Sequence, residues 1–333
     1  MADLLTPVVR LAPAKLNLTL AVLGRRRDGF HDLHSVMVPL ALSDRLSFAP
    51  AAGPRDSLHV TGDQFGSTTL EPAGFGSVLA GIAEARRVVG RGADTFPLAV
   101  RLHKQIPVAA GLAGGSSDAA AAIDGAIESW RADVDATARL RAAAAVGSDV
   151  PFFLVGGPAL IEGRGEKVTP LAGIEGSPPG VLLVTPALEA STKVVFATFD
   201  ADPAAAPGFR GSTRLSSEHL AQELGPTYGA MDAQALASRA GVFAVSNDLA
   251  KAADIVVPGL RELRRALTRL LGVPIGLSGS GPTLWALYPS LDGAEAAAAK
   301  VREELALGTL DAPGTQPPFV AATVIVSPPR RIA

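Results

Sequence analysis

The chain has 333 residues, of which 48% are hydrophobic and 19% charged, a balance typical of a folded protein long enough for two domains. Its net charge of −2 argues against a nucleic-acid-binding protein, and the absence of cysteine excludes disulfides, thiolate metal sites and a cysteine nucleophile. The histidines lack zinc-ligand spacing, the N-terminus lacks a signal-peptide pattern, and the longest uncharged runs are too short or too interrupted to span a membrane. We therefore expect a cytoplasmic enzyme with no membrane and no nucleic-acid partner.

The first predicted strand with functional character covers residues 16–22, where hydrophobic and polar residues alternate. Side chains two residues apart share a strand face, so Lys15, Asn17 and Thr19 lie together. A face of this composition is poor core material, which indicates either a functional site or an exposed edge strand. Further strands are expected at residues 8–11, 35–42, 45–48 and 57–60, and a helix at residues 77–89.

A glycine-rich stretch at residues 107–118 lies between an alternating segment, residues 98–106, and an alanine-rich run, residues 119–127. This order predicts a strand, a glycine loop and the start of a helix. Its three glycines allow close approach to a ligand, and the two serines and the aspartate that end it are common helix N-caps. Because a helix N-terminus attracts anions, the stretch is a candidate phosphate site. An ordinary strand-to-helix turn is the alternative.

The chain continues with a helix at residues 135–146 and then Asp149, directly before the apolar run at residues 150–155. A carboxylate in such surroundings is partly desolvated unless it has partners, so Asp149 is either a functional residue or a helix or turn cap. Residues 159–161 and 167–171 have the pattern of a hairpin.

A Gly- and Pro-rich segment at residues 173–180 is the best candidate for a domain boundary, so we predict domains at residues 1–176 and 177–333. Alternating strand and helix patterns in the second half indicate an α+β sandwich. These elements are expected at residues 181–185, 215–224, 232–237, 258–271, 284–288, 293–305 and 319–326.

Several widespread catalytic motifs are missing. The chain has no G-x-x-x-x-G-K-[ST] phosphate loop, no G-x-S-x-G nucleophile turn, and no G-x-G-x-x-G after a first strand. A P-loop enzyme, an α/β-hydrolase and a dinucleotide-binding fold are therefore disfavoured.

Three ordered motifs instead resemble the GHMP kinase superfamily: A-P-A-K-L-N at residues 12–17, P-x-x-x-G-L-x-G-G-S-S at residues 107–117, and G-L-S-G-S-G-P-T at residues 276–283. R-R-D-G-F-H at residues 26–31 and G-S-D-V-P-F-F at residues 147–153 resemble the branch that phosphorylates 4-diphosphocytidyl-2-C-methyl-D-erythritol. The resemblance implies a two-domain α+β fold: an N-terminal α/β domain with the phosphate loop, a C-terminal ferredoxin-like sandwich, and an active site in the interdomain cleft.

The activity implied by the resemblance is ATP-dependent phosphorylation of the 2-hydroxyl of that cytidine-diphosphate-linked methylerythritol, in the non-mevalonate route to isoprenoids. Asp149 matches the family's catalytic aspartate, which accepts the proton of the attacking hydroxyl, and Lys15 matches its catalytic lysine. We expect Lys15 to keep Asp149 ionised and to stabilise charge on the reacting oxygens. Mg²⁺ is the implied metal, without a marked protein ligand. The implied ATP-binding residues are Pro107, Val108, Ala109, Ala110, Gly111, Leu112, Ala113, Gly114, Gly115, Ser116 and Ser117.

For the substrate, Phe30 and His31 match an aromatic–histidine pair that holds the cytosine, by stacking and by a hydrogen bond to its edge. Asn17 matches a substrate-contacting position beside Lys15, and Thr192 aligns with a substrate-side threonine of the second domain.

Four positions depart from the family pattern. Phe30 replaces a tyrosine, and Ser77 replaces an asparagine near the adenine. Ala113 replaces a loop glycine and fits only if its φ is negative. Asp118 replaces an asparagine, and its carboxylate would repel phosphate unless it caps the helix or assists Mg²⁺.

Two alternatives stay open. The chain could be another GHMP small-molecule kinase, of the homoserine or mevalonate type, or a GHMP-like binding protein without turnover. A monomer or a weak homodimer is expected in each case.

Overall fold

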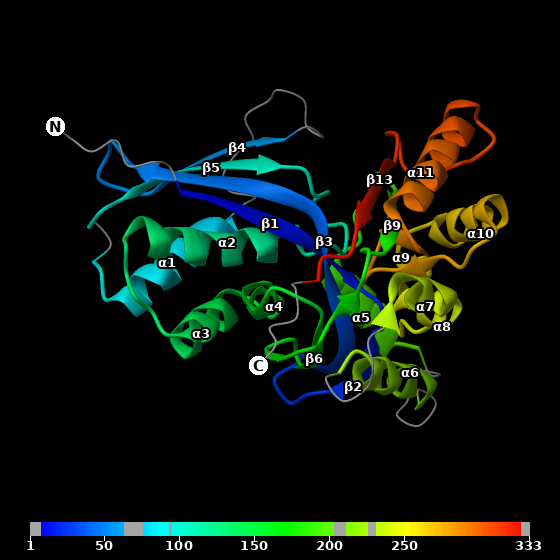
Figure 1. The fold of residues 1–333 in the computed structure, drawn as a ribbon, viewed down its shortest axis with the longest axis horizontal. Helices are drawn as coiled ribbons and strands as arrows, with labels where there is room; N and C mark the ends of the chain where they lie inside the picture. The colour runs from blue at the N-terminus through cyan, green and yellow to red at the C-terminus, as the bar shows by residue number, and fades with distance from the viewer. Residues whose placement is uncertain (1–7, 63–75, 93–94, 203–210, 226–230, 328–333) are drawn as a thin grey trace. The chain divides into compact units, whose positions relative to one another are not determined.

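The computed structural model describes the whole chain except residues 1–7, 63–75, 93–94, 203–210, 226–230 and 328–333. The chain divides into two compact units, which are described separately (Figure 1). Unit 1 comprises Met1–Ala14, Leu42–Val108 and Ala113–Val155, and unit 2 comprises Lys15–Ala41, Ala109–Leu112 and Gly156–Ala333. The domain limits at residues 1–176 and 177–333 stay a prediction. Among the helices of the described residues, none is long and apolar enough to cross a membrane.

Unit 1 contains a sheet formed by β4 (Ser57–Gly62), β5 (Leu98–Lys104) and the second half of β3 (His31–Pro50). β5 pairs antiparallel with β3 and parallel with β4. In β5 every second side chain is buried, as the alternating sequence predicts. The strand thus presents one face to the core and carries its last residue, Lys104, to the start of the glycine-rich stretch.

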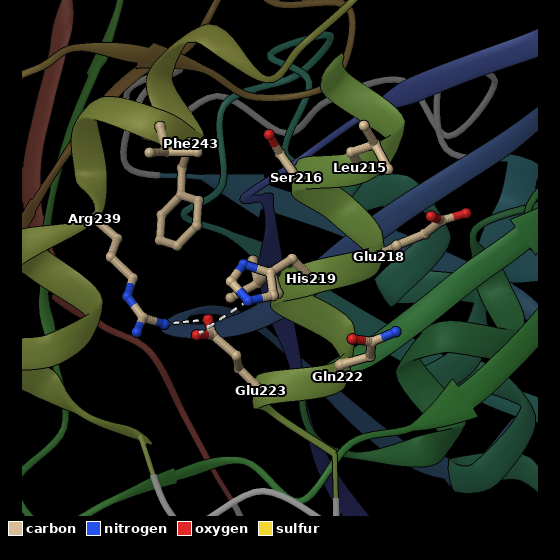
Figure 2. A pocket seen from close by; sticks show the side chains of 10 residues that line it. Leu215, Ser216, Glu218, His219, Gln222, Glu223, Arg239 and Phe243 are labelled. Carbon is tan, nitrogen blue, oxygen red and sulfur yellow. Dashed lines mark hydrogen bonds and ion pairs between the residues drawn. The ribbon is translucent and has the colours of Figure 1, made fainter. Parts of the chain in front are cut away.

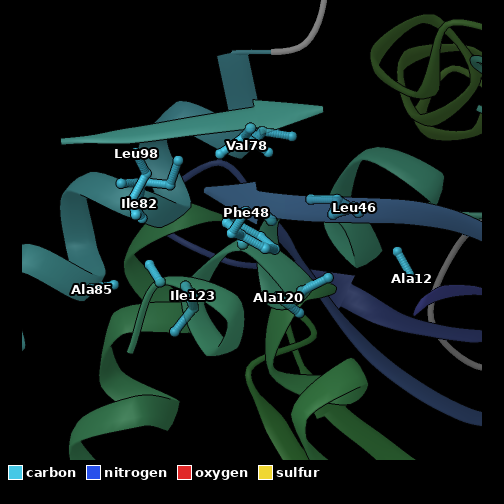
Figure 3. Packing of buried hydrophobic residues seen from close by; sticks show 14 of the residues in the cluster. Ala12, Leu46, Phe48, Val78, Ile82, Ala85, Leu98, Ala120 and Ile123 are labelled. Atoms are coloured by element: carbon cyan, nitrogen blue, oxygen red, sulfur yellow. The ribbon is translucent and has the colours of Figure 1, made fainter. Parts of the chain in front are cut away.

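The described residues of unit 1 also form the helices α1 (Gly76–Val89), α2 (Gly114–Ser129), α3 (Ala136–Val146) and α4 (Val150–Val155). The small residues of α2 allow close packing, because a Cβ on Gly125 would overlap the ring of Phe48. Figure 3 shows Phe48 of β3 packed among residues of α1 and α2, including Ile82 and Ile123. Each of these fully buried side chains contributes about 1.5–3 kcal/mol through removal from water. This core holds α2 against the sheet.

Unit 2 contains a four-stranded sheet in the order β11 (Gly276–Leu277), β12 (Leu284–Tyr288), β9 (Gly180–Thr185) and β13 (Phe319–Val324). All six residues of β9 are buried, because it has a strand on each side and helix α11 (Leu291–Ala306) against it. Helix α10 (Leu260–Leu271) buries Leu260, Leu263 and Leu267 at helical spacing, as the sequence predicts.

The remaining strands of unit 2 include β2 (Ala21–Arg25), which pairs antiparallel with the first half of β3. β6 (Ala159–Gly163) and β7 (Lys167–Pro170) form the predicted hairpin. The other elements are β8 (Ile174–Glu175), β10 (Met231–Asp232), α5 (Thr192–Asp200), α6 (Gly211–Glu223), α7 (Ala233–Ser238), α8 (Ala240–Val245) and α9 (Ala250–Val256). The sequence patterns did not identify α5, α8 or α9.

Two N-terminal strands are longer than predicted, and the strand expected at residues 16–22 is wrong, since β1 ends at Asn17 and β2 begins at Ala21. The structure has a continuous β1 (Val8–Asn17) and a continuous β3, whereas the sequence suggested breaks within both. Asp44 lies in the break expected between the strands at residues 35–42 and 45–48. Asp44 is fully buried and accepts hydrogen bonds from backbone N–H groups beyond the end of β5, so its polarity marks a buried contact and not a turn.

Candidate active site

The glycine-rich stretch has the predicted order of strand, loop and helix: β5 ends at Lys104 and α2 begins at Gly114. Ser116 and Ser117 donate their N–H groups to the carbonyl of Ala113, and Gly115 is exposed. The N–H groups of Gly114 and Gly115 precede these first hydrogen bonds of the helix and lie at the positive end of its dipole. The start of α2 therefore offers what a phosphate group requires.

The expected N-cap role of the residues after the glycines is wrong. The N-cap of α2 is Ala113, so Ser116, Ser117 and Asp118 lie inside the helix. The helix starts earlier because the left-handed conformation of Ala113 turns its carbonyl onto the N–H groups that follow. The hydroxyl of Ser117 is buried and has no hydrogen-bond partner among the described residues.

Alanine at position 113 was expected to fit only with a negative φ, but the φ of Ala113 is +53°. The left-handed conformation costs a residue with a side chain about 1–2 kcal/mol. Ala109, in the same stretch, has a φ of +54°. The loop therefore keeps a shape suited to glycine while carrying alanine at two positions.

Asp118 faces the interior of unit 1. Its Oδ2 accepts a hydrogen bond of 2.7 Å from Nζ of Lys104, and the same ammonium also donates to Oδ2 of Asp44. Asp44, Lys104 and Asp118 are 0%, 2% and 0% exposed. The concern that Asp118 would face the phosphates is thus wrong, because Lys104 draws its carboxylate into a buried ion cluster.

The charges of this cluster shift the pKa of two of its members. Burial raises the pKa of Asp118 to about 7; Lys104 opposes this shift and Asp44 adds to it. Burial also acts to lower the pKa of Lys104, but the attraction of Asp118 and Asp44 outweighs it and the pKa ends above its ordinary value.

In unit 2, Lys15 lies beside the central part of the glycine-rich stretch. Its Nζ donates to Oδ1 of Asn17 at 2.6 Å and to the carbonyl of Gly111 at 2.5 Å, and its backbone N–H donates to the carbonyl of Leu112. Lys15 and Asn17 are 3% and 2% exposed. The predicted shared face of Lys15 and Asn17 is confirmed, and the reading of this segment as an exposed edge strand is wrong.

The third motif, at residues 276–283, also contacts the carbonyl of Gly111 in the glycine-rich stretch. The hydroxyl of Ser278 donates to the carbonyl of Gly111 at 3.0 Å. Gly111 has a φ of +77°, and a Cβ there would lie 2.9 Å from the carbonyl oxygen of Gly281. A Cβ on Gly279 would lie 3.1 Å from Nζ of Lys15. Both glycines are needed for the motifs to approach this closely.

Asn247 fixes the backbone of the third motif. Its side-chain amide donates to the carbonyls of Leu277 and Gly279, both at 2.9 Å. Thr192 is the first residue of α5, and its hydroxyl lies 3.0 Å from that of Ser280. The structure thus joins a predicted substrate residue to the glycine motif next to Lys15.

A buried hydrogen-bond network extends behind Asn17. Its Nδ2 donates to Oγ of Ser35, which donates to the carbonyl of Thr19. The hydroxyl of Thr19 donates to Ser217, whose oxygen lies 2.8 Å from Nδ1 of His34. Burial lowers the pKa of His34, which favours the neutral ring. The network fixes the orientation of the amide that faces Lys15.

Phe30 and His31 have different surroundings. Phe30 is 49% exposed, and the guanidinium of Arg164 lies 5.2 Å from its ring centre. The ring of His31 stacks on Phe196 with centres 4.7 Å apart, and its Nε2 lies 2.8 Å from Oδ1 of Asp200. Phe196 and Asp200 lie on α5 and were missed, since the sequence patterns did not identify that helix.

Asp149 and Ser77 belong to unit 1. Asp149 is partly buried in the turn that leads into α4. Ser77, at the start of α1, is close to the first turn of α2, since a Cβ on Gly115 would lie 3.6 Å from its hydroxyl. These two residues therefore stand on the same unit as α2.

A separate hollow of about 640 Å³ lies between α6 and α8 (Figure 2). Figure 2 shows Glu223 of α6 paired with Arg239 and with His219 of the same helix. None of the predicted site residues lines this hollow, so we assign it no part in the chemistry. The lining residues are Leu215, Ser216, Glu218, His219, Leu220, Gln222, Glu223, Arg239, Val242 and Phe243.

Within the described parts of the chain, no group of three or more His, Cys, Asp or Glu side chains is placed to hold a metal ion.

Two family models match the chain: the N-terminal domain of GHMP kinases at residues 78–157 and the C-terminal domain of GHMP kinases at residues 228–307. The 4-diphosphocytidyl-2-C-methyl-D-erythritol kinase of Pelotomaculum thermopropionicum is 36% identical over 298 residues, which cover 89% of this chain and 94% of that protein.

Solved structures agree on the fold. A crystal structure of 4-(cytidine 5'-diphospho)-2C-methyl-D-erythritol kinase is 28% identical with a TM-score of 0.65, covering 95% of this chain and 99% of its own. Homoserine kinase from Cytophaga hutchinsonii has a TM-score of 0.68, covering 98% of this chain and 96% of its own, at only 14% identity. Because the folds match about equally well, sequence identity is what distinguishes the two relatives.

Proposed function

Since the chain belongs to the 4-diphosphocytidyl-2-C-methyl-D-erythritol kinase family of the GHMP kinases, we propose that it transfers the γ-phosphoryl group of ATP to the 2-hydroxyl of this substrate. The observation that carries the proposal is the near full-length similarity to a kinase of that name. The product would be the 2-phosphate, formed in the methylerythritol phosphate route to isoprenoids.

The glycine-rich stretch fits the triphosphate of ATP. The start of α2 supplies N–H groups and a positive dipole end, and Ser117 supplies a buried hydroxyl without a protein partner among the described residues. The carboxylate of Asp118 is bound by Lys104 inside unit 1 and so does not point at an anion there. Residues 107–117 would hold the phosphates, and ATP would supply the phosphoryl group.

Lys15 and Asp149 are assigned the chemical roles. Phosphoryl transfer depends mainly on positioning and charge stabilisation, so a base of ordinary strength is enough. Asp149 would accept the proton of the substrate hydroxyl, and Lys15 would stabilise negative charge on the reacting oxygens. Its contacts with Asn17 and Gly111 hold the ammonium in one orientation, which supports this role.

The cytidine end is assigned to aromatic side chains of unit 2. The exposed ring of Phe30 offers a stacking surface, and the stacked rings of His31 and Phe196 offer another. The contact between His31 and Asp200 orients the imidazole, which leaves one ring nitrogen for the edge of a base. Asn17 and Thr192 would contact the alcohol portion of the substrate.

Mg²⁺ would bind together with ATP. Because the described residues contain no cluster of metal-ligating side chains, the ion would be carried mainly by the phosphate oxygens. It would neutralise phosphate charge.

The test is a coupled ADP-release assay with four alcohols: 4-diphosphocytidyl-2-C-methyl-D-erythritol, 2-C-methyl-D-erythritol 4-phosphate, homoserine and mevalonate. We expect turnover with the first only, since the second lacks the CMP portion that the aromatic residues would bind. Turnover with homoserine or mevalonate would instead indicate another GHMP kinase. Binding of ATP without turnover of any alcohol would indicate a non-catalytic relative.

A further inference from the structure

Three buried ionisable side chains of unit 1 meet at the base of the phosphate loop, and the proposed chemistry uses none of them. Asp44 lies in β3, Lys104 is the last residue of β5, and Asp118 lies in the second turn of α2. At most 2% of any of the three residues is exposed. Burying charged groups costs free energy unless they are paired, so three of them at this position indicate a specific role.

The cluster joins the two ends of the loop. Oδ1 of Asp44 accepts hydrogen bonds from the backbone N–H groups of Gln105 and Ile106, at 2.6 and 2.9 Å, directly before the loop begins. Nζ of Lys104 binds Asp44 and also Asp118 on the helix that leaves the loop. The entry and the exit of the loop are therefore held to one ammonium.

Lys104 is placed to act through the backbone and not by direct contact with a ligand. Its ammonium lies between two carboxylates, below the surface. A Cβ on Gly114 would lie 3.2 Å from Nζ of Lys104 and 3.1 Å from the side chain of Ile106. The first residue of α2 thus packs directly on the cluster, and its position depends on that of the lysine.

We propose that Asp44, Lys104 and Asp118 are positioning residues for ATP, which join the segment entering the phosphate loop to the helix leaving it and so set the affinity of the loop for the triphosphate. The inference rests on the proposed binding of ATP at this loop. It adds a function for three residues that do not touch the nucleotide.

The charge of the cluster is adjustable at Asp118. With both carboxylates ionised the cluster has a net charge of −1, and Oδ1 of Asp118 has no hydrogen-bond partner among the described residues. Burial, supported by Asp44 and opposed by Lys104, raises the pKa of Asp118 to about 7. A proton on Asp118 removes the net charge. The anionic triphosphate is therefore bound more weakly as Asp118 ionises.

Several charged groups on and around α2 have other ion-pair partners, among them Glu128 of α2, which pairs with Arg10. On α1, Arg87 pairs with Glu84, and Arg86 pairs with Asp56. Arg139 of α3 pairs with Asp124, also on α2. The groups that act on Asp118 are Lys104 of β5 and Asp44 of β3.

The experiment measures the affinity of the wild-type protein, Asp118→Asn and Asp124→Asn for a non-hydrolysable ATP analogue by calorimetry between pH 6 and 9. Because the ionisation of the analogue affects all three proteins equally, the ratio to Asp118→Asn isolates the cluster. We expect the wild type and Asp124→Asn to lose roughly three- to tenfold more affinity than Asp118→Asn as the pH rises. Identical pH profiles for Asp118→Asn and the wild type would overturn the electrostatic part of the inference.

The positioning part is tested by Asp44→Asn in the ADP-release assay. We expect the KM for ATP to rise by about tenfold, since charge-assisted hydrogen bonds are lost, while kcat at saturating ATP stays within about threefold. An unchanged KM for ATP, or a loss confined to kcat, would overturn it. If this variant does not fold, the KM for ATP of Asp118→Ala, compared with that of Asp124→Ala at pH 6, decides. Asp118 is mostly protonated at pH 6, so the change removes its bond to Lys104 and little charge, and equal values overturn positioning. Failure of the wild type to bind the analogue would instead reject the proposed function itself.

Discussion

The two units each bury a lysine beside the glycine-rich stretch, and the two lysines have different surroundings. Lys104 in unit 1 is shared by the carboxylates of Asp44 and Asp118. Lys15 in unit 2 donates to the amide oxygen of Asn17 and to the carbonyl of Gly111. Two carboxylates neutralise the ammonium that they share, and the bonds of Lys15 to Asn17 and Gly111 hold its ammonium in one orientation. We therefore propose a structural role for Lys104 and a chemical role for Lys15.

The largest expected effect is the loss of turnover in Lys15→Met and in Asp149→Asn. Removing either group should lower kcat by roughly 10²–10⁴, because each is assigned to charge or proton handling in the transition state. Steady-state ADP release measures this loss. Lys300→Met, at an exposed lysine of α11, is the control and should keep its turnover. A kcat of Asp149→Asn within about threefold of the wild type would contradict the assignment.

Lys104→Met tests the structural role of Lys104 in unit 1. Its removal leaves Asp44 and Asp118 facing one another in the core, so we expect the free energy of unfolding to fall by about 3–5 kcal/mol. Denaturant unfolding measures the change, with Lys300→Met expected within about 0.5 kcal/mol of the wild type. A loss below about 1 kcal/mol would mean that the cluster does not stabilise unit 1.

The pH dependence of the free energy of unfolding tests whether Asp118 titrates in the folded protein. Its pKa in the folded protein, about 7, lies above its ordinary value of 3.8, so the folded form binds the proton more tightly. Its contribution to stability is fully present below about pH 4 and falls as the pH rises, until the loss is complete above about pH 7. The fall is on the order of 2–4 kcal/mol.

Thermal or denaturant unfolding between pH 4 and 8 measures this slope. Asp118→Asn should flatten it and should be at least as stable as the wild type at pH 8, because one buried carboxylate is gone while the Asp44–Lys104 pair remains. The same slope in both proteins would show that another group titrates.

The smallest expected effect is at Ala113. Replacement by glycine relieves the left-handed strain and should raise the free energy of unfolding by up to about 1 kcal/mol. Ala145→Gly is the matched control: Ala145 is exposed in helix α3, where glycine costs roughly 0.5–1 kcal/mol. Equal losses in both variants would show that the φ of Ala113 carries no strain.

Much of the fold was predictable because it depends on local patterns. The alternation of β5 and the leucine spacing of α10 appear directly in the buried faces of these elements. Helix α5 was not identified, although it carries Thr192, Phe196 and Asp200. The pairing of Phe196 and Asp200 with His31 joins residues more than 160 positions apart, and no local pattern encodes such a contact.

By itself the sequence determined the two-domain α+β class, the three ordered motifs and the kinase family, because these depend on residue order and short spacings. Only the tertiary structure decided what Asp118 and Ala113 do. The carboxylate of Asp118 is drawn inward by Lys104, 14 positions away in the sequence, and Ala113 takes a positive φ to begin α2. The orientation of Asp118 and the φ of Ala113 depend on which charges and carbonyl groups come together in the folded chain. An unpaired buried charge costs more free energy than a strained backbone angle.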